Sequence, residues 1–142
     1  MTSTQPVGRE AGMAQAPERC RALVIDDSES VRTVLRRMLE EESVPVIEAT
    51  SGAEALDRMR CDPSIGVVFL DMNMPGMSGL EVLRIVRSEP ELANIPIVVL
   101  TGGSANGVIA AKDLGAAGWL QKPVRLEAIV NVARNFLVRE AE

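Results

Sequence analysis

The stretch VVFLDMNMPGMSG, residues 67–79, predicts a strand, a loop and a helix start in direct succession. Its opening run, Val67 to Leu70, is apolar without alternation, which is typical of a strand covered on both faces in a parallel sheet. Asp71 follows this run directly, and a Pro-Gly pair marks a turn beyond it. Ser78 and Glu81 match a capping box, in which the two side chains satisfy free amides at a helix start. A strand that leads through a polar loop into a helix is the repeating unit of α/β folds.

Two further apolar runs, residues 22–25 and 97–100, have the same character as Val67–Leu70. They predict two more buried strands. Residues 44–49 and 118–121 are weaker candidates, and they complete a set of five strands.

Amphipathic segments separate these strands. Residues 31–39 and 126–137 carry apolar side chains at helical spacing, and residues 51–54 match a second capping box. Residues 105–114 form the least regular predicted helix, because Gly107 interrupts it and its apolar stripe is thin. Strand and helix alternate five times, which predicts an α/β domain with a doubly wound, five-stranded parallel sheet and helices on both faces. Ligands bind such sheets outside the carboxyl ends of the strands.

The chain of 142 residues has the length of one domain. Residues 1–18 are rich in small and polar side chains and predict a disordered tail, so the folded domain is expected at residues 19–142. No apolar run approaches the roughly 20 uncharged residues of a membrane-spanning helix. Residues 1–10 also lack the apolar core of a secretory signal. We therefore expect a soluble, cytoplasmic protein with no membrane association.

Charge and composition exclude several other classes of function. The net charge is −5 and the basic side chains are scattered along the chain, so direct binding of nucleic acid is not expected. Cys20 and Cys61 lie far apart and form no metal or redox motif. The chain contains no histidine, so any phosphohistidine in its chemistry must belong to a partner protein.

Reactive polar side chains follow the predicted strands. Asp26 and Asp27 come after the first strand, Asp71 after the third, Thr101 after the fourth and Lys122 after the fifth. Each alone has an ordinary explanation, because an aspartate can cap a helix, a threonine suits a strand and a lysine is commonly solvated. The carboxyl ends of parallel strands share one edge of the sheet, so we expect these side chains to converge there.

Three carboxylates at one edge repel each other unless a cation or a lysine offsets their charge. Mg²⁺ suits such a site, because it prefers oxygen ligands and is held by one or two carboxylates together with a phosphate oxygen. Asp71 is then a candidate nucleophile, since a carboxylate that attacks phosphorus forms an acyl phosphate. Metal, lysine and hydroxyl groups stabilise the charge on the transferring oxygens, and Asp27, Lys122 and Thr101 can supply these roles.

Four motifs follow one another along the chain: VIDDS (residues 24–28), LDMNMPGMSG (residues 70–79), VLTG (residues 99–102) and GWLQKP (residues 118–123). In their order and spacing the sequence resembles the response-regulator receiver family over about residues 21–140. The resemblance implies a flavodoxin-like (βα)5 fold and a phosphorylatable receiver domain of a two-component system.

By this resemblance, Asp71 is the phosphoacceptor and one of the metal ligands. Asp27 and the backbone carbonyl of Asn73 would bind Mg²⁺ directly, and Asp26 would act mainly through a water molecule. Lys122 would contact the phosphoryl group, and the Lys122–Pro123 bond resembles the family's cis peptide.

The resemblance also implies a switch. Thr101 would swing its hydroxyl toward the acyl phosphate, and Trp119 would rotate inward behind it at a position where the family usually has Tyr or Phe. The surface made by the fourth helix, fifth strand and fifth helix would change with phosphorylation.

Partners follow from the same resemblance. A sensor histidine kinase or a histidine phosphotransfer protein would donate the phosphoryl group, and the domain would bind an unidentified downstream protein or relay the group. The chain would be a monomer or a phosphorylation-dependent dimer, and it would catalyse only its own phosphorylation and dephosphorylation rather than act as an enzyme.

Two alternatives remain from the sequence. A phosphohydrolase that forms an aspartyl phosphate would need a second acid where this chain has Asn73. A docking module that kept only the fold would not need the complete set of charged groups.

Overall fold

The computed structural model describes residues 19–103 and 105–137 as alternating strands and helices. In chain order they are β1 (Arg21–Ile25), α1 (Glu29–Glu40), β2 (Val46–Ala49), α2 (Gly52–Cys61), β3 (Ile65–Asp71), α3 (Gly79–Ser88), β4 (Ile97–Thr101), α4 (Ala105–Asp113), β5 (Gly118–Gln121) and α5 (Leu126–Phe136). The tail predicted at residues 1–18 lies outside the described residues.

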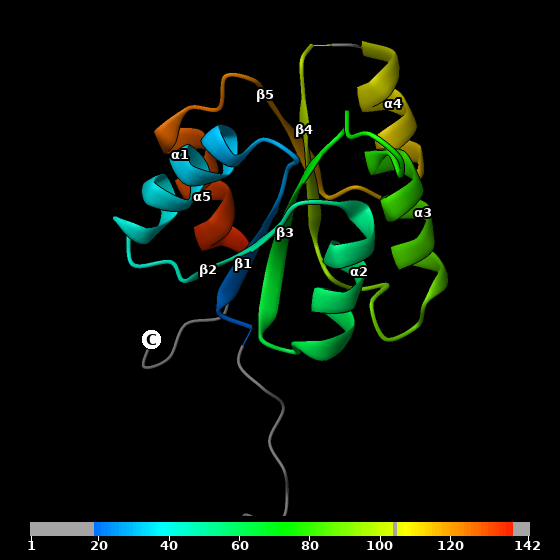
Figure 1. The fold of residues 1–142 in the computed structure, drawn as a ribbon, viewed down its shortest axis with the longest axis horizontal. Coiled ribbons are helices and arrows are strands. Elements are labelled where there is room, and N and C mark those ends of the chain that lie inside the picture. Colours follow the sequence, from blue (N-terminus) through cyan, green and yellow to red (C-terminus); the bar gives the residue numbers. More distant parts are fainter. Residues whose placement is uncertain (1–18, 104, 138–142) are drawn as a thin grey trace, which may run out of the picture.

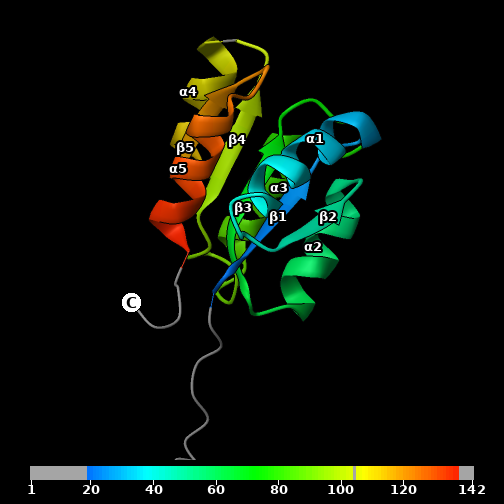
Figure 2. The ribbon, with the colours of Figure 1, turned by 90° about the vertical axis from the view of Figure 1, so that its left-hand side faces the viewer.

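The five strands form one parallel sheet in the order β2-β1-β3-β4-β5. Helices α1 and α5 cover one face, and α2, α3 and α4 cover the other (Figure 1). Figure 2 shows the same layers from the side, with α1 and α5 in front of the sheet. β2 lies on one side of β1, and β3 and the later strands lie on the other side, so the strand order reverses beside β1. The predicted doubly wound fold is confirmed, and its ligand edge lies at the carboxyl ends of β1 and β3.

Both faces of the sheet are apolar, which explains why the strand sequences do not alternate. In β1, Leu23 and Ile25 belong to the cluster beneath α2 and α3, whereas Ala22 and Val24 belong to the cluster beneath α1 and α5. All four side chains are fully buried. This packing fixes the strand whose end carries two of the predicted site residues.

The strands extend slightly beyond the predicted runs. Asp71 is the last residue of β3 and Thr101 the last of β4, although the sequence placed both just after their strands. The ladder continues because the Met72 amide donates to the Leu100 carbonyl at 3.1 Å and the Lys122 amide donates to the Thr101 carbonyl at 2.7 Å. The backbone that carries Asp71 and Thr101 is therefore fixed by sheet hydrogen bonds and does not belong to a loop.

Serine residues cap three of the helices. The Ser28 hydroxyl accepts the Val31 amide at the start of α1, so neither Asp26 nor Asp27 is the cap. The capping box of Ser78 and Glu81 at α3 is complete. At α2 half of the predicted capping box is present, because the Ser51 hydroxyl accepts the Glu54 amide. The other half is wrong, because the Glu54 carboxylate accepts the Thr50 amide at 2.7 Å and the Thr50 hydroxyl at 2.9 Å instead of the Ser51 amide.

Helix α4 is the helix whose pattern was weakest. It forms over Ala105–Asp113, and within these described residues Ala111 is the one buried position. Ile109 is 58% exposed. The thin apolar stripe of α4 thus corresponds to shallow packing of this helix on the sheet.

Candidate functional site

Three aspartates meet at the carboxyl ends of β1 and β3. Asp26 and Asp71 are buried, at 1% and 2% exposure, whereas Asp27 is exposed. One carboxylate oxygen from each lies within 4.8 Å of the others. The sheet brings them together because β1 and β3 are neighbours whose registers place Ile25 opposite Leu70. The convergence predicted from the sequence is therefore present.

Lys122 bridges the two buried acids. Its Nζ atom lies 2.9 Å from Oδ1 of Asp71 and 3.2 Å from Oδ2 of Asp26. The lysine reaches them from the loop after β5, where the Lys122–Pro123 peptide is cis, as the resemblance implies. The ammonium group thus joins the ends of β1, β3 and β5 in one charged cluster.

Burial and charge oppose each other at Asp71. Desolvation raises the pKa of this carboxyl above its usual range, and the nearby charge of Asp26 adds to the rise, although the bonds from Lys122 and the Asn73 amide act to lower it. Desolvation acts to lower the pKa of Lys122, but the hydrogen bonds and charges of Asp71 and Asp26 together raise it above its usual value. The lysine is therefore firmly cationic at neutral pH.

The loop after β3 is shaped around Asp71. The Asn73 amide donates to Oδ1 of Asp71 at 3.2 Å, and the Gly79 amide donates to the Met72 carbonyl at 3.2 Å. A Cβ atom on Gly79 would lie 2.6 Å from the Asp71 carbonyl oxygen, so only glycine allows α3 to begin this close to the strand end. The loop places the Asn73 backbone beside the acids.

Thr101 lies on the same edge, one strand away. It is 3% exposed, and its Oγ1 atom accepts the Gly103 amide at 3.2 Å. Its carbonyl accepts the Lys122 amide, so the end of β4 is tied to the residue that follows β5.

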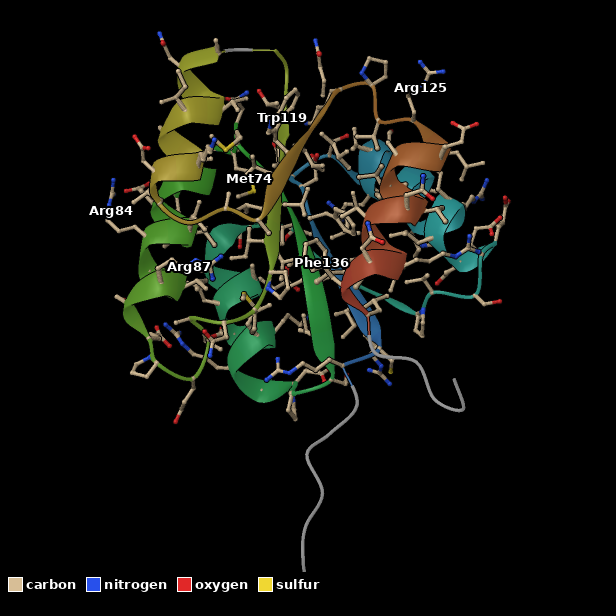
Figure 3. The ribbon with its side chains drawn as sticks, turned by 180° about the vertical axis from the view of Figure 1, so that it is seen from behind. Met74, Arg84, Arg87, Trp119, Arg125 and Phe136 are labelled. Atoms are coloured by element: carbon tan, nitrogen blue, oxygen red, sulfur yellow. The ribbon has the colours of Figure 1, made fainter. Side chains whose placement is uncertain are left out.

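Trp119 is turned outward and is 52% exposed (Figure 3). It lines a pocket of about 230 Å³ together with Val99, Val108, Ala111, Lys112 and residues 116–118. The inward rotation expected from the sequence stays a prediction.

The cluster suits a hard cation. Its three carboxylates offer only oxygen, and among the described residues no histidine or cysteine joins them. An all-oxygen set of this kind matches Mg²⁺ and does not match zinc.

The model of the response regulator receiver domain family matches residues 22–134. The chain belongs to that family. Response regulator MprA of Mycolicibacterium vanbaalenii is 42% identical over 120 residues, which cover 84% of this chain and 51% of MprA. The sensor kinase/phosphatase CqsS of Vibrio cholerae is 35% identical over 113 residues, which cover 78% of this chain and 16% of CqsS. The chain thus spans only part of the length of these two relatives.

Solved receiver structures have the same fold. The chemotaxis protein CheY4 of Vibrio cholerae is similar with a TM-score of 0.76 at 32% identity, over 83% of this chain and 98% of CheY4. Receiver domains are phosphoacceptors of two-component signalling, so membership favours this function over the phosphohydrolase and the docking module. Within residues 19–103 and 105–137, no helix is long and apolar enough to cross a membrane.

The sequence reasoning overlooked Arg32. This side chain is 9% exposed, and its Nη1 atom donates to the Asp26 carbonyl at 2.7 Å. One signal was available, because Arg32 shares the spacing of Leu35 and Leu39 on the apolar stripe of α1, where a charge needs a buried partner.

Proposed function

We propose that Asp71 accepts a phosphoryl group from a phosphohistidine on a sensor histidine kinase or a histidine phosphotransfer protein. The N–P bond of the donor breaks as a carboxylate oxygen of Asp71 bonds to phosphorus, and the imidazole nitrogen takes the electron pair. Water later attacks the phosphorus and releases inorganic phosphate, which restores the carboxylate. The observation that carries this proposal is the double contact of Lys122 with Asp71 and Asp26.

We assign the metal ligands to the same cluster. Asp27, Asp71 and the Asn73 carbonyl would hold Mg²⁺, with Asp26 acting mainly through a water molecule. Bound Mg²⁺ would offset negative charge on the acids and on the transferring oxygens. The mixture of buried and exposed acids supports this assignment, because Asp27 faces solvent, from which the ion arrives.

Lys122 and Thr101 complete the proposed machinery. The Lys122 ammonium, already beside Asp71, would pair with a phosphoryl oxygen once the carboxylate is esterified. The Thr101 hydroxyl would leave the Gly103 amide and donate to another phosphoryl oxygen. Both groups would act on the domain's own phosphorylation and dephosphorylation, and not on a separate substrate.

We assign the phosphodonor protein and the downstream partner to two different surfaces. A groove of about 500 Å³, lined by α1 residues and by Lys122, Pro123 and Val124, would give the donor histidine an apolar seat beside Lys122. The α4-β5-α5 surface, with exposed Trp119, would signal to a downstream protein or take part in a relay. Cys20 and Cys61 are free thiols, which fits the reducing cytoplasm where we place the protein.

Intact-mass measurement tests the proposal. Wild-type protein incubated with Mg²⁺ and a small acyl phosphate donor is expected to gain one phosphoryl mass, and Asp71→Asn protein is expected to gain none. A chelator should suppress the gain in the wild type. A wild type without added mass, or an equal gain in Asp71→Asn, would contradict the assignment of Asp71.

A further inference from the structure

A buried arginine holds the peptide unit that joins the two adjacent acids. Arg32 lies in the first turns of α1, and helical side chains lean toward the helix N-terminus, which directs its guanidinium back to the end of β1. Its Nη1 atom donates to the Asp26 carbonyl at 2.7 Å, and its Nε atom lies 3.1 Å from Oε1 of Glu48 on β2. The guanidinium thus connects α1, β1 and β2 beneath the acids.

This contact completes the restraint of Asp26. Its amide donates to the Ala49 carbonyl at 3.2 Å, its Oδ1 accepts the Ser28 amide at 2.9 Å, and its Oδ2 faces Lys122. Arg32 takes the remaining polar atom, the carbonyl oxygen. Because a peptide unit is planar, fixing this carbonyl also fixes the amide of Asp27 on the other side of the bond. The direction in which Asp27 leaves the strand is therefore set by a residue that does not touch it.

The location of Arg32 is electrostatically unfavourable by itself. A cation near a helix N-terminus opposes the helix dipole, and burial of a guanidinium requires partners. Glu48 and the Asp26 carbonyl are those partners. Arg36, on the next turn, also pairs with Glu48 at 3.0 Å but has no bond to Asp26, so charge balance at Glu48 does not require Arg32.

We infer that Arg32 is a positioning residue for the divalent cation, acting through the Asp26–Asp27 peptide. The inference rests on the proposed function, because it assumes that Asp27 binds Mg²⁺. Residues that orient metal ligands from behind commonly change metal affinity by about tenfold or more when replaced. The direction of the change in Mg²⁺ affinity distinguishes positioning from a simple charge effect. Removal of a positive charge near an acidic site would by Coulomb's law strengthen cation binding, whereas loss of positioning weakens it.

Calorimetric titration of folded protein with Mg²⁺ alone tests the inference. Arg32→Met is expected to bind Mg²⁺ about tenfold more weakly than the wild type, and Arg32→Lys, which cannot reproduce the planar fork, several-fold more weakly. Arg36→Met is the matched control, since it also removes a cation bound to Glu48, and its affinity should stay within twofold of the wild type. If Arg32→Met does not fold, Arg32→Lys, which keeps the positive charge but loses the planar fork, carries the test in the same direction.

A second readout separates positioning from a general loss of structure. At saturating Mg²⁺, phosphorylation of the Arg32 variants by a small acyl phosphate should return to within about twofold of the wild-type rate, because Arg32 does not contact Asp71 or Lys122. Unchanged or tighter Mg²⁺ binding by the Arg32 variants would overturn the inference, as would an equal loss in Arg36→Met. A wild type that binds no Mg²⁺ would instead overturn the proposed function itself.

Discussion

At the carboxyl ends of β1 and β3, which we call the enclosed side, Asp26 and Asp71 are buried, whereas the segment after β4 lies open to solvent. Asp26 and Asp71 are each at most 2% exposed and are bound by Lys122, while Gly102 and Gly103 next to Thr101 are exposed. Helix α1 buries three residues against the sheet, but α4 buries only Ala111 within its described residues 105–113.

This difference indicates which region can hold the phosphorylation site and which region can change its conformation. Groups that hold an ion and a phosphoryl group need fixed geometry, and a surface that changes shape needs weak packing. Both kinds of structure meet at Thr101, which is buried in β4 and precedes the exposed glycines. We expect the region from β1 to α1 to stay fixed and the region from β4 to β5 to respond.

The largest expected effect is the difference in stability between truncating an apolar side chain in α1 and truncating one in α4. Leu39→Ala in α1 removes a fully buried side chain and is expected to lower the free energy of unfolding by about 3 kcal/mol. Ile109→Ala in α4 removes an exposed one and should cost less than about 0.5 kcal/mol. Urea unfolding of both variants measures the difference, and similar losses would show that α4 is as tightly packed as α1.

Lys122→Met tests the charge balance of the enclosed side. In the presence of a chelator the variant leaves Asp26 and Asp71 without their cation, and we expect a loss of about 2 kcal/mol in the free energy of unfolding. Saturating Mg²⁺ should recover most of this loss, because the ion binds the same carboxylates. A loss that Mg²⁺ does not change would argue against a shared site.

Arg87→Ala tests what anchors the responsive side. Arg87 on α3 (Figure 3) donates to the Ala93 and Ile95 carbonyls before β4, and to the Gly115 carbonyl after α4 at 2.6 Å. We expect a loss of about 1–2 kcal/mol and faster amide exchange at the C-terminal end of α4.

Arg84→Ala is the control for this variant, because Arg84 is an exposed arginine of the same helix. It should change stability by less than about 0.5 kcal/mol. Equal exchange at the end of α4 in both variants would mean that Arg87 does not anchor this helix.

The smallest expected effect is the pH dependence of Asp71→Asn without metal. Desolvation raises the pKa of Asp71 in the folded state, so the stability linked to the protonated carboxyl is lost as pH rises through the folded pKa. The asparagine variant should therefore be the more stable protein at neutral pH. The gain in the free energy of unfolding should be less than about 1 kcal/mol, because Lys122 loses a charged partner and this offsets part of it. The advantage should vanish below the unfolded pKa of about 3.9. Thermal unfolding across pH measures it, and a less stable variant at neutral pH would contradict the sign.

Much of the enclosed side was predictable from the sequence. Unbroken apolar runs such as Val67–Leu70 indicated strands buried on both faces, and parallel strands bring their ends to one edge, which placed the acids together. The contacts that cross between loops were not predictable. The carbonyls bound by Arg87 belong to irregular backbone, and Glu54 bonds to Thr50 through a local choice between two nearby amides.

Hydrogen exchange before and after phosphorylation tests the division between the two regions most directly. We expect phosphorylation to change amide exchange in residues 101–121 while residues 29–40 keep theirs, and Asp71→Asn protein treated identically to show no change. Phosphorylated protein with unaltered exchange in residues 101–121, or with an equal change in α1, would contradict the account.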